Sequence, residues 1–461
     1  MAITIVQQPE GLFNIGAGAS GAVMFSRAKL VSTYTTSSIA QTNFKYLVQI
    51  DENGSQIFEA YVSPNPANAL VFDMSPIVRG RLKAPDAMIN TGNYSIHRGN
   101  GVLVNKCTDN QNIYNIKIGE VYEVDGVLTE FPDLREDPYL IINGAQDYKD
   151  FITDLGGIQL DMQDYSCNYF SAPDLKKGFL TNVNKNTYEG TERNDYWRVL
   201  SGSTTMQPTR VTDLGRLAWI HDSDYVGNDV VGAKYSWHNA AGTVLATATI
   251  DVTDAAQGGQ ALNSTSPTGK VQAIPCHWGS MSQEGVLIGG YTNALDWVYY
   301  TIQLIQTNDD IANSKWGFYK ECSGNKNELY QLAWTNGVGF WDYYTFTPKA
   351  EHEESVEKKQ YSTNVGSYSS ANFKIFKYEA STKNYQITPK RSWTLASGKI
   401  DENLSMYLKD ILKARQVQLI GPDGSILPVI VDTNSTKFFK DRTNNLYDFQ
   451  IKVTLAQSLE A

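Results

Sequence analysis

Histidine and cysteine are scarce in this 461-residue chain, which has five of the first and four of the second. No histidine pair has HExxH or HxH spacing, and Cys276 and His277 are adjacent, so on a strand they would point to opposite faces. No CxxC pair occurs, and a disulfide framework is not expected in a chain of this size. We therefore expect no metal site and four reduced thiols: Cys107, Cys167, Cys276 and Cys322.

Long apolar runs are also missing, and positive charge is in short supply. No segment approaches the 18 consecutive apolar residues of a membrane span, and the start, MAITIVQQPEGL, lacks the features of a secretory signal. The chain has 39 Lys and Arg against 49 Asp and Glu, a net charge of −10. An acidic chain is poorly suited to binding nucleic-acid phosphates or anionic lipids. We expect folding in a cytoplasm, with no membrane partner and no specific nucleic-acid partner.

Aromatic residues and glycine are abundant, with 27 Tyr, 17 Phe, 9 Trp and 36 Gly. Aromatic and β-branched residues favour strands, and Gly and Asn favour tight turns. Asn53-Gly54 and Asp125-Gly126 lie between alternating segments and predict two hairpins. Further hairpins are predicted around Asn239–Gly242 and on the turn Pro422–Gly424. The composition predicts a mainly β chain made of antiparallel β-sandwich-type domains.

Three regions are predicted along the chain: an N-terminal β domain (1–165), a central β domain (166–348) and a small C-terminal α+β module (349–461). The first region includes a short predicted helix at 144–155. The charged run AEHEESVEKKQY (350–361) is interpreted as a solvated linker or helix face that begins the third region. In that module, Asp401 is the expected N-cap of a helix whose apolar stripe is Leu404, Leu408, Ile411 and Leu412.

The C-terminal module also contains the most regular strand pattern. In NLYDFQIKVTL (445–455), apolar residues from Tyr447 to Leu455 alternate with polar ones. Such alternation predicts an antiparallel strand with one face in water.

One motif suggests a cofactor. Gly16, Gly18 and Gly21 form a GxGxxG frame, the fingerprint of a dinucleotide-binding turn. That turn requires a preceding strand and an acidic residue about 20 positions later. Pro9 and Gly11 interrupt the preceding segment, and no Asp or Glu occurs between residues 27 and 50. We interpret the frame as a flexible loop and expect no cofactor.

Catalytic patterns are otherwise lacking. GxSxG and P-loop motifs are absent, and the acidic turn after His221 lacks the register of an EF-hand. A carboxylate pair for glycoside cleavage depends on the fold and cannot be chosen from 49 acidic residues. We expect no enzymatic activity and assign no catalytic residues.

A dense aromatic cluster is the only candidate for a contact site. Trp and Tyr dominate binding hot spots, so the cluster is a candidate subunit interface or sugar platform. The alternative is a hairpin buried in a core, because alternate positions of paired strands must be covered somewhere. The candidate residues are Trp334, Phe340, Trp341, Tyr343 and Tyr344.

Three segments resemble virion proteins of tailed bacteriophages, including crAss-like and marine phages. In YQLAWTNGVGFWDYYTFTPKAEHEESVEKKQY (330–361) a strand leads into an Asn-Gly turn, an aromatic strand and a charged stretch ending in Lys-x-Tyr. NFKYLVQIDENGS (43–55) is similar to their early hairpin, and residues 393–456 are similar to their C-terminal module. The GAGASG stretch departs from that pattern.

The resemblance implies a structural protein of the tail, baseplate or neck, located in the virion after assembly in the bacterial cytoplasm. Its expected partners are copies of itself in a ring-like homo-oligomer and other virion proteins, and an acidic inner wall would suit a passive DNA conduit. One alternative is a carbohydrate- or receptor-binding tail protein, which would expose an aromatic groove. Another is a β-rich glycan-degrading enzyme, which would place two carboxylates in one cleft.

Overall fold

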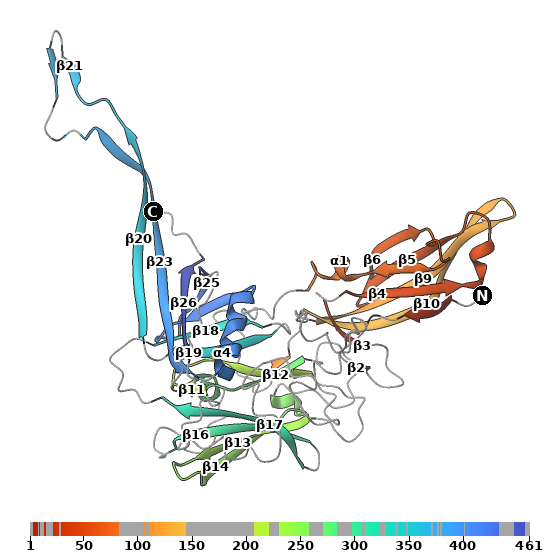
Figure 1. Cartoon of the computed structure of the whole chain (residues 1–461), viewed down its shortest axis with the longest axis horizontal. Helices are drawn as coiled ribbons and strands as arrows, with labels where there is room; N and C mark the ends of the chain where they lie inside the picture. Colours follow the sequence, from red (N-terminus) through yellow and green to blue (C-terminus); the bar gives the residue numbers. More distant parts are fainter. Residues whose placement is uncertain are drawn as a thin grey trace.

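The described part of the chain is mainly β, as the composition predicts, with several antiparallel sheets and few short helices (Figure 1). Two short parallel pairings, β3 (Ala22–Phe25) with β10 (Val127–Ile142) and β11 (Gln207–Thr209) with β17 (Asp309–Lys320), are the exceptions among the described pairs. The computed structural model describes residues 3–7, 9, 13–14, 22–26, 29–82, 105–106, 111–143, 207–220, 230–257, 271–283, 297–306, 309–321, 329–336, 340–346, 349–369, 372–375, 378, 380–400, 402–432 and 447–456.

The N-terminal region forms a β-sandwich, called here the N-terminal sandwich. A three-stranded sheet, in the order β1 (Ile3–Gln7), β4 (Val31–Thr36), β7 (Leu70–Asp73), packs against a six-stranded sheet. Apolar side chains from both sheets form one core, which confirms the sandwich character of this region. The six-stranded sheet has the order β2 (Phe13–Asn14), β3 (Ala22–Phe25), β10 (Val127–Ile142), β9 (Gln111–Val124), β5 (Lys45–Glu52) and β6 (Ser55–Val62).

Two hairpins of this sandwich follow directly from their turn residues. Asn53 and Gly54 have φ of 49° and 82°, and Asp125 and Gly126 have φ of 51° and 80°. Positive φ at both central positions is the requirement of the tight turn that matches the twist of paired strands. The β5–β6 and β9–β10 hairpins are therefore confirmed. Short helices η1 (Ser37–Ala40) and α1 (Ser75–Val78) connect other strands, while the expected helix at 144–155 lies outside the described residues.

The central region contains two sheets around a core rich in tryptophan. The three-stranded sheet has the order β12 (Arg216–Ile220), β15 (Val271–Pro275), β8 (Asn105–Lys106). The region also contains two short helices, η5 (Ala255–Gln257) and α3 (Trp278–Gln283). β8 falls within the expected first domain, yet it pairs with β15. The five-stranded sheet has the order β11 (Gln207–Thr209), β17 (Asp309–Lys320), β16 (Tyr299–Gln306), β13 (Val230–His238) and β14 (Val244–Asp251).

A seven-stranded antiparallel sheet, called here the C-terminal sheet, includes strands that the sequence assigned to the central domain. β18 pairs with β24, which follows it by more than 80 residues, so the expected boundary at 348/349 divides one sheet. We therefore place the start of this module before β18. The order is β19 (Trp341–Phe346), β18 (Tyr330–Thr335), β24 (Val417–Ile420), β25 (Ile426–Val431), β26 (Tyr447–Leu455), β23 (Thr382–Ile400) and β20 (Lys349–Ser362).

The helix and strands at the C-terminal end agree with their sequence patterns. The helix α4 (Glu402–Lys409) continues into η7 (Asp410–Lys413) and packs Leu408 and Ile411 into the core of the sheet. Asp401, the expected N-cap, lies outside the described residues. In β26, Phe449, Ile451 and Val453 are buried, as the alternation predicts.

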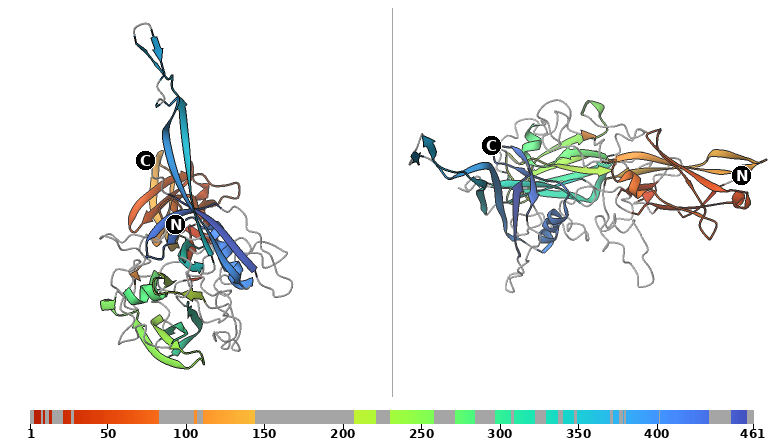
Figure 2. Two further views of the ribbon diagram at one scale, coloured as in Figure 1. Left: turned by 90° about the vertical axis from the view of Figure 1, so that its left-hand side faces the viewer. Right: turned by 90° about the horizontal axis from the view of Figure 1, so that it is seen from above.

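The charged run is neither a linker nor a helix face. Residues 349–362 form β20, which pairs with β23 along its whole length, and this corrects the sequence interpretation. The backbone of β20 forms its hydrogen bonds with β23, and the side chains of residues 351–362 are exposed. A strand held in this way needs no alternation of apolar and polar residues, so its sequence gives no strand signal. The two strands leave the sheet as a long ribbon, which ends near a small hairpin of β21 (Ser367–Ser369) and β22 (Asn372–Lys374) (Figures 1 and 2).

The N-terminal sandwich offers a direct test of its strand register. A Cβ atom at Gly119 would lie 2.5 Å from the Phe131 carbonyl oxygen and 2.9 Å from Pro132 Cα, both backbone atoms beside a β-bulge. We expect Gly119→Ala to lower the opening free energy of β9 and β10 by about 2 kcal/mol, because the bulge must move. Hydrogen exchange of amides in residues 111–142 measures this. The control is Gly80→Ala, where the added carbon meets nothing within 4 Å; equal protection in the two variants would contradict the register.

Candidate functional site

The aromatic cluster predicted as an interface lies in the interior. Trp334 is on β18, Phe340 precedes β19, and Trp341, Tyr343 and Tyr344 are on β19. All five side chains are buried, and every described position of β19 is buried, because both faces of this strand are covered. The structure therefore shows the alternative, a core hairpin, and these residues offer no surface to a partner.

One face of this hairpin packs on the core of the C-terminal sheet, and the other meets the central region. The Trp334 ring lies 5.1 Å from that of Tyr407, whose hydroxyl donates to the Tyr343 carbonyl oxygen at 3.0 Å. On the opposite side, the Tyr343 ring lies 5.9 Å from the His277 imidazole in an edge-on contact. The hairpin thus joins two layers instead of facing solvent.

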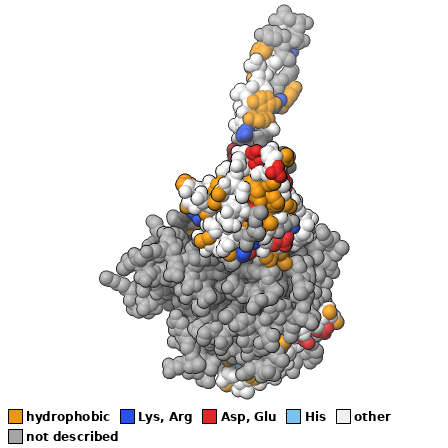
Figure 3. All heavy atoms as spheres, turned by 90° about the vertical axis from the view of Figure 1, so that its right-hand side faces the viewer, with side chains coloured by type: hydrophobic (Ala, Val, Ile, Leu, Met, Phe, Trp, Pro, Cys, Tyr) orange, Lys and Arg blue, Asp and Glu red, His pale blue; other side chains and the backbone are white. Residues whose placement is uncertain are grey.

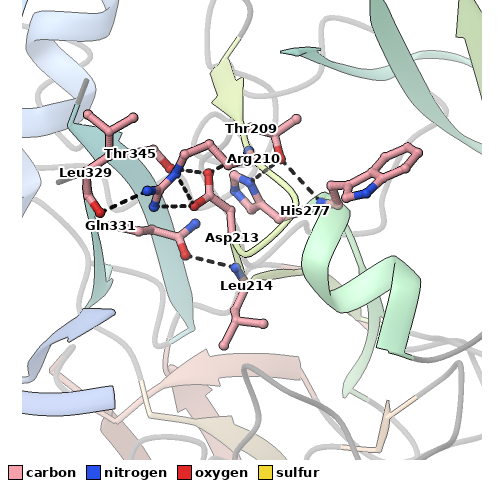
Figure 4. A network of polar contacts seen from close by, with 9 residues as sticks. Thr209, Arg210, Asp213, Leu214, His277, Leu329, Gln331 and Thr345 are labelled. Atoms are coloured by element: carbon pink, nitrogen blue, oxygen red, sulfur yellow. Dashed lines mark hydrogen bonds and ion pairs between the residues drawn. The ribbon is translucent and has the colours of Figure 1, made fainter. Parts of the chain in front are cut away.

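A buried polar network, called here the junction, fixes the chain between β11 and β12 against the C-terminal sheet (Figure 4). Asp213 is fully buried and forms an ion pair with Arg210, with Nη2 and Oδ1 2.6 Å apart. Asp213 Oδ2 also accepts from the Thr345 hydroxyl on β19 at 2.7 Å. Arg210 Nη1 donates to the Leu329 carbonyl oxygen at 2.9 Å. Charged hydrogen bonds of this kind are costly to break on one side only.

Two further contacts close the junction. The Leu214 amide donates to Gln331 Oε1, and the Gly215 amide donates to Ser280 Oγ, both at 2.9 Å. A Cβ at Gly215 would lie 2.5 Å from His277 Cδ2 and 3.0 Å from Tyr343 Cγ, so glycine is required for this close approach. The described contacts of the junction join distant segments of the same chain at buried positions. We therefore assign the junction a structural role.

The described histidines have structural surroundings. His238 Nδ1 lies 3.3 Å from the Gly242 carbonyl oxygen, and His238 Nε2 lies 3.3 Å from the Thr301 hydroxyl. The His352 ring stacks on that of Trp393, with 5.2 Å between the ring centres. His277 Nδ1 is 3.3 Å from the Thr209 hydroxyl. Cys276 is a buried free thiol. The GxGxxG glycines, His97 and the acidic turn after His221 lie outside the described residues.

Two kinds of feature were also sought in the described part of the chain. It contains no group of three or more His, Cys, Asp or Glu residues placed to hold a metal ion. None of its helices has the length and apolar character that crossing a bilayer requires.

The most unusual surface is the ribbon of β20 and β23, which sequence analysis missed. Beyond the Glu354–Arg391 pair, β23 no longer pairs with β26, and among the described strands no other continues the sheet there. We call residues 355–390 the arm. Its eight β20 residues alone span about 25 Å at the usual rise of an extended strand. All described positions of β20 from 351 to 362 are exposed, so neither face of this strand is covered.

The arm exposes apolar and aromatic side chains. Val356 is 48% exposed and Tyr385 63% exposed. The rings of Tyr361 and Tyr385 contact each other at 6.2 Å, which leaves both large rings at the surface of the ribbon. Exposed apolar groups of this size mark interaction sites when they cluster. The remaining members of the set are Phe373, Ile375, Tyr378 and Ile387.

Charge is distributed unevenly along the ribbon. At its base, Glu354 pairs with Arg391 at 3.4 Å and Glu353 with Lys452 at 2.8 Å. The arm itself contains six lysines and two glutamates, a net charge of +4. Because the whole chain has a net charge of −10, the residues outside the arm have a net charge of −14. The two adjacent lysines 358 and 359 were visible in the sequence, but only the fold shows that they lie on an exposed ribbon.

Comparison with known protein families finds no matching family model, and comparison with curated proteins finds no match.

The junction generates a prediction about pH. Burial lowers the pKa of His277 to about 4, against an unfolded value near 6.5, and Asp213 opposes this only in part. Between pH 4 and pH 6.5 the unfolded chain has a protonated His277 and the folded chain a neutral one. The contribution of this group to the free energy of unfolding is therefore complete above pH 6.5, and about 3 kcal/mol of it is lost as the pH falls to 4.

Urea unfolding of the intact protein from pH 7 to pH 4 measures this dependence. His277→Asn keeps a polar group near Thr209 but cannot titrate, so its stability should fall less steeply over this range. His352→Asn is the matched control, because it makes the same substitution at an exposed position. Identical slopes for all three proteins would contradict the burial of a neutral His277.

Proposed function

We propose that this protein is a structural subunit of a tailed-phage virion, in the tail, baseplate or neck, and that it acts through contacts between subunits. The observation that carries the proposal is the arm. A two-stranded hairpin without a third strand or a packed face is marginally stable in water. An arm of this length with apolar side chains on its surface is suited to a second molecule that covers it.

The apolar side chains of the arm can contribute a substantial part of the binding free energy of such a contact. Completing the burial of a half-exposed Val, Ile or Tyr gains about 1 kcal/mol. The seven exposed apolar and aromatic side chains of the arm are distributed over both of its strands and its tip. Their combined burial would offset a substantial part of the entropy lost on association.

The resemblance to phage virion proteins and the composition support the same function. The chain is rich in tyrosine and tryptophan, and an arm that contacts a different surface on the neighbouring subunit makes a heterologous contact. Such heterologous contacts generate rings when the rotation between subunits closes. This is the assembly expected of tail, baseplate and neck components.

A second candidate function has one observation in its favour. Tyr378 is 81% exposed and Phe373 is 50% exposed, both in the segment between the two long strands of the arm. Exposed aromatic rings at the end of a projecting ribbon would also suit a receptor- or carbohydrate-binding tail protein. Saturable binding of glycans by the isolated protein, lost in Phe373→Ser, would favour this candidate.

The proposed function is tested by shortening the arm. The pair Ser355 and Lys390 lies just beyond the last ion pair of the base, so residues 356–389 can be replaced by Asn-Gly. We expect the natural protein to form defined oligomers and the shortened protein to be monomeric in mass photometry. Unchanged far-ultraviolet circular dichroism per residue in the retained sheets verifies folding. Oligomers of equal size in both proteins would contradict the proposal.

A matched pair of point variants separates the apolar contact from the length of the arm. Tyr385→Ser removes an exposed ring from the arm, and we expect weaker self-association. Val71→Ser removes a comparably exposed side chain (52%) from β7 of the N-terminal sandwich, and we expect no change.

A further inference from the structure

The six-stranded sheet of the N-terminal sandwich has one face in the core, and its other face has exposed charged residues around a few buried ones such as Leu47 and Val121. Strand register assigns the faces: Tyr46, Val48 and Ile50 point into the core, so the alternate residues of β5 and their partners point outward. We call the outward side of this sheet the outer face. By the same register it includes Tyr61 and Glu59 of β6, Leu128, Glu130 and Glu136 of β10, and Lys117 and Glu123 of β9.

The outer face is acidic. It contains five carboxylates and two lysines by strand register, a net charge of −3. Glu59, Glu130 and Tyr61 are exposed. The side of the molecule drawn in Figure 3 shows acidic and hydrophobic side chains next to one another. The full charged set is Lys45, Asp51, Glu59, Lys117, Glu123, Glu130 and Glu136.

Its carboxylates differ in their surroundings. Lys117 Nζ lies 3.1 Å from both Asp51 Oδ2 and Glu136 Oε1, so this lysine neutralises the interior of the face. Glu59 Oε2 accepts instead from the side-chain amides of Gln49 and Gln56, both at 2.8 Å.

Glu130 has a comparable neutral partner. Its Oε1 accepts from the Tyr61 hydroxyl at 2.7 Å. Within the described residues, neither Glu59 nor Glu130 forms an ion pair with a basic side chain. These two carboxylates hold their negative charge in fixed positions, where a cation from outside can reach them.

We propose that the arm of one copy docks on the outer face of the N-terminal sandwich of a second copy, with arm lysines paired to Glu59 and Glu130. This inference rests on the proposed function and specifies the receiving surface. Lys358, Lys359 and Lys383 supply the positive charge, and Tyr61 and Leu128 meet the apolar groups of the arm. Opposite charges on the two surfaces favour this pairing and increase its association rate.

The arm and the outer face of one chain cannot satisfy each other. The arm rises from the C-terminal sheet at one end of the molecule, and the N-terminal sandwich lies at the other end, as Figure 1 and the right-hand view of Figure 2 show. The contact is therefore between copies, head to tail. Arm-to-arm pairing would bring two surfaces of charge +4 together, and a nucleic acid attracted by the arm would be repelled by the remaining −14 of the chain.

Charge exchange tests the pairing. The arm variant combines Lys358→Glu, Lys359→Glu and Lys383→Glu, and the face variant combines Glu59→Lys and Glu130→Lys. We expect each to weaken self-association of the full-length protein by at least about tenfold, because like charges then meet. The variant with all five changes should recover self-association. Arg415→Glu, at an exposed position that belongs to neither surface, is the control and should associate as the natural protein does.

The outcomes separate this inference from the proposed function. If the shortened arm abolishes oligomers but the face variant does not, another surface receives the arm, and the inference is overturned while the proposed function stands. If the arm variant lowers affinity for a 30-nucleotide single-stranded DNA and leaves self-association unchanged, the arm binds nucleic acid, and the inference is again overturned. Recovery by the five-fold variant supports it, because restored pairing alone explains that result.

Discussion

The ribbon of β20 and β23 imposes the physical constraint on which this account depends. Inside the sheet, β23 pairs with β26 on one side and with β20 on the other, whereas in the arm it pairs with β20 alone, and the β20 residues there are exposed. The base is well anchored, since Trp393 is buried and stacks on His352 at the point where β23 joins β26. A firmly held base and an uncovered arm are the basis of our proposal that a second surface covers the arm.

The junction explains why the base can act as a rigid support. Asp213 is held by Arg210 from its own segment and by the Thr345 hydroxyl from β19, so a hydrogen bond to a buried ion pair joins the central region to the C-terminal sheet. Tyr407 extends the connection from α4 to the backbone of β19. The acidic outer face of the N-terminal sandwich would provide the complementary charge for the head-to-tail contact that we propose.

Local signals predicted a good part of this fold. The turns at Asn53-Gly54 and Asp125-Gly126 have the positive φ that their residues favour, and the alternation of residues 447–455 placed the buried face of β26 correctly. The sequence-based predictions were wrong where a partner far away in the sequence decides the structure. The charged run became a strand because β23 pairs with it, and β19 lost its alternation because a second layer covers its outer face. The 132-residue separation of Asp213 and Thr345 likewise leaves no local trace.

Hydrogen exchange of the arm at two protein concentrations is the most direct test of the central claim. Amides of residues 355–362 and 382–391 should exchange rapidly in dilute monomer, because a two-stranded ribbon opens readily. They should become protected at concentrations where oligomers form, together with amides of β5 and β6 beneath the receiving face, while amides of the buried β18 remain unchanged. Protection of the arm that is equally strong in monomer and oligomer would show that the ribbon is stable without a partner, and it would contradict the account.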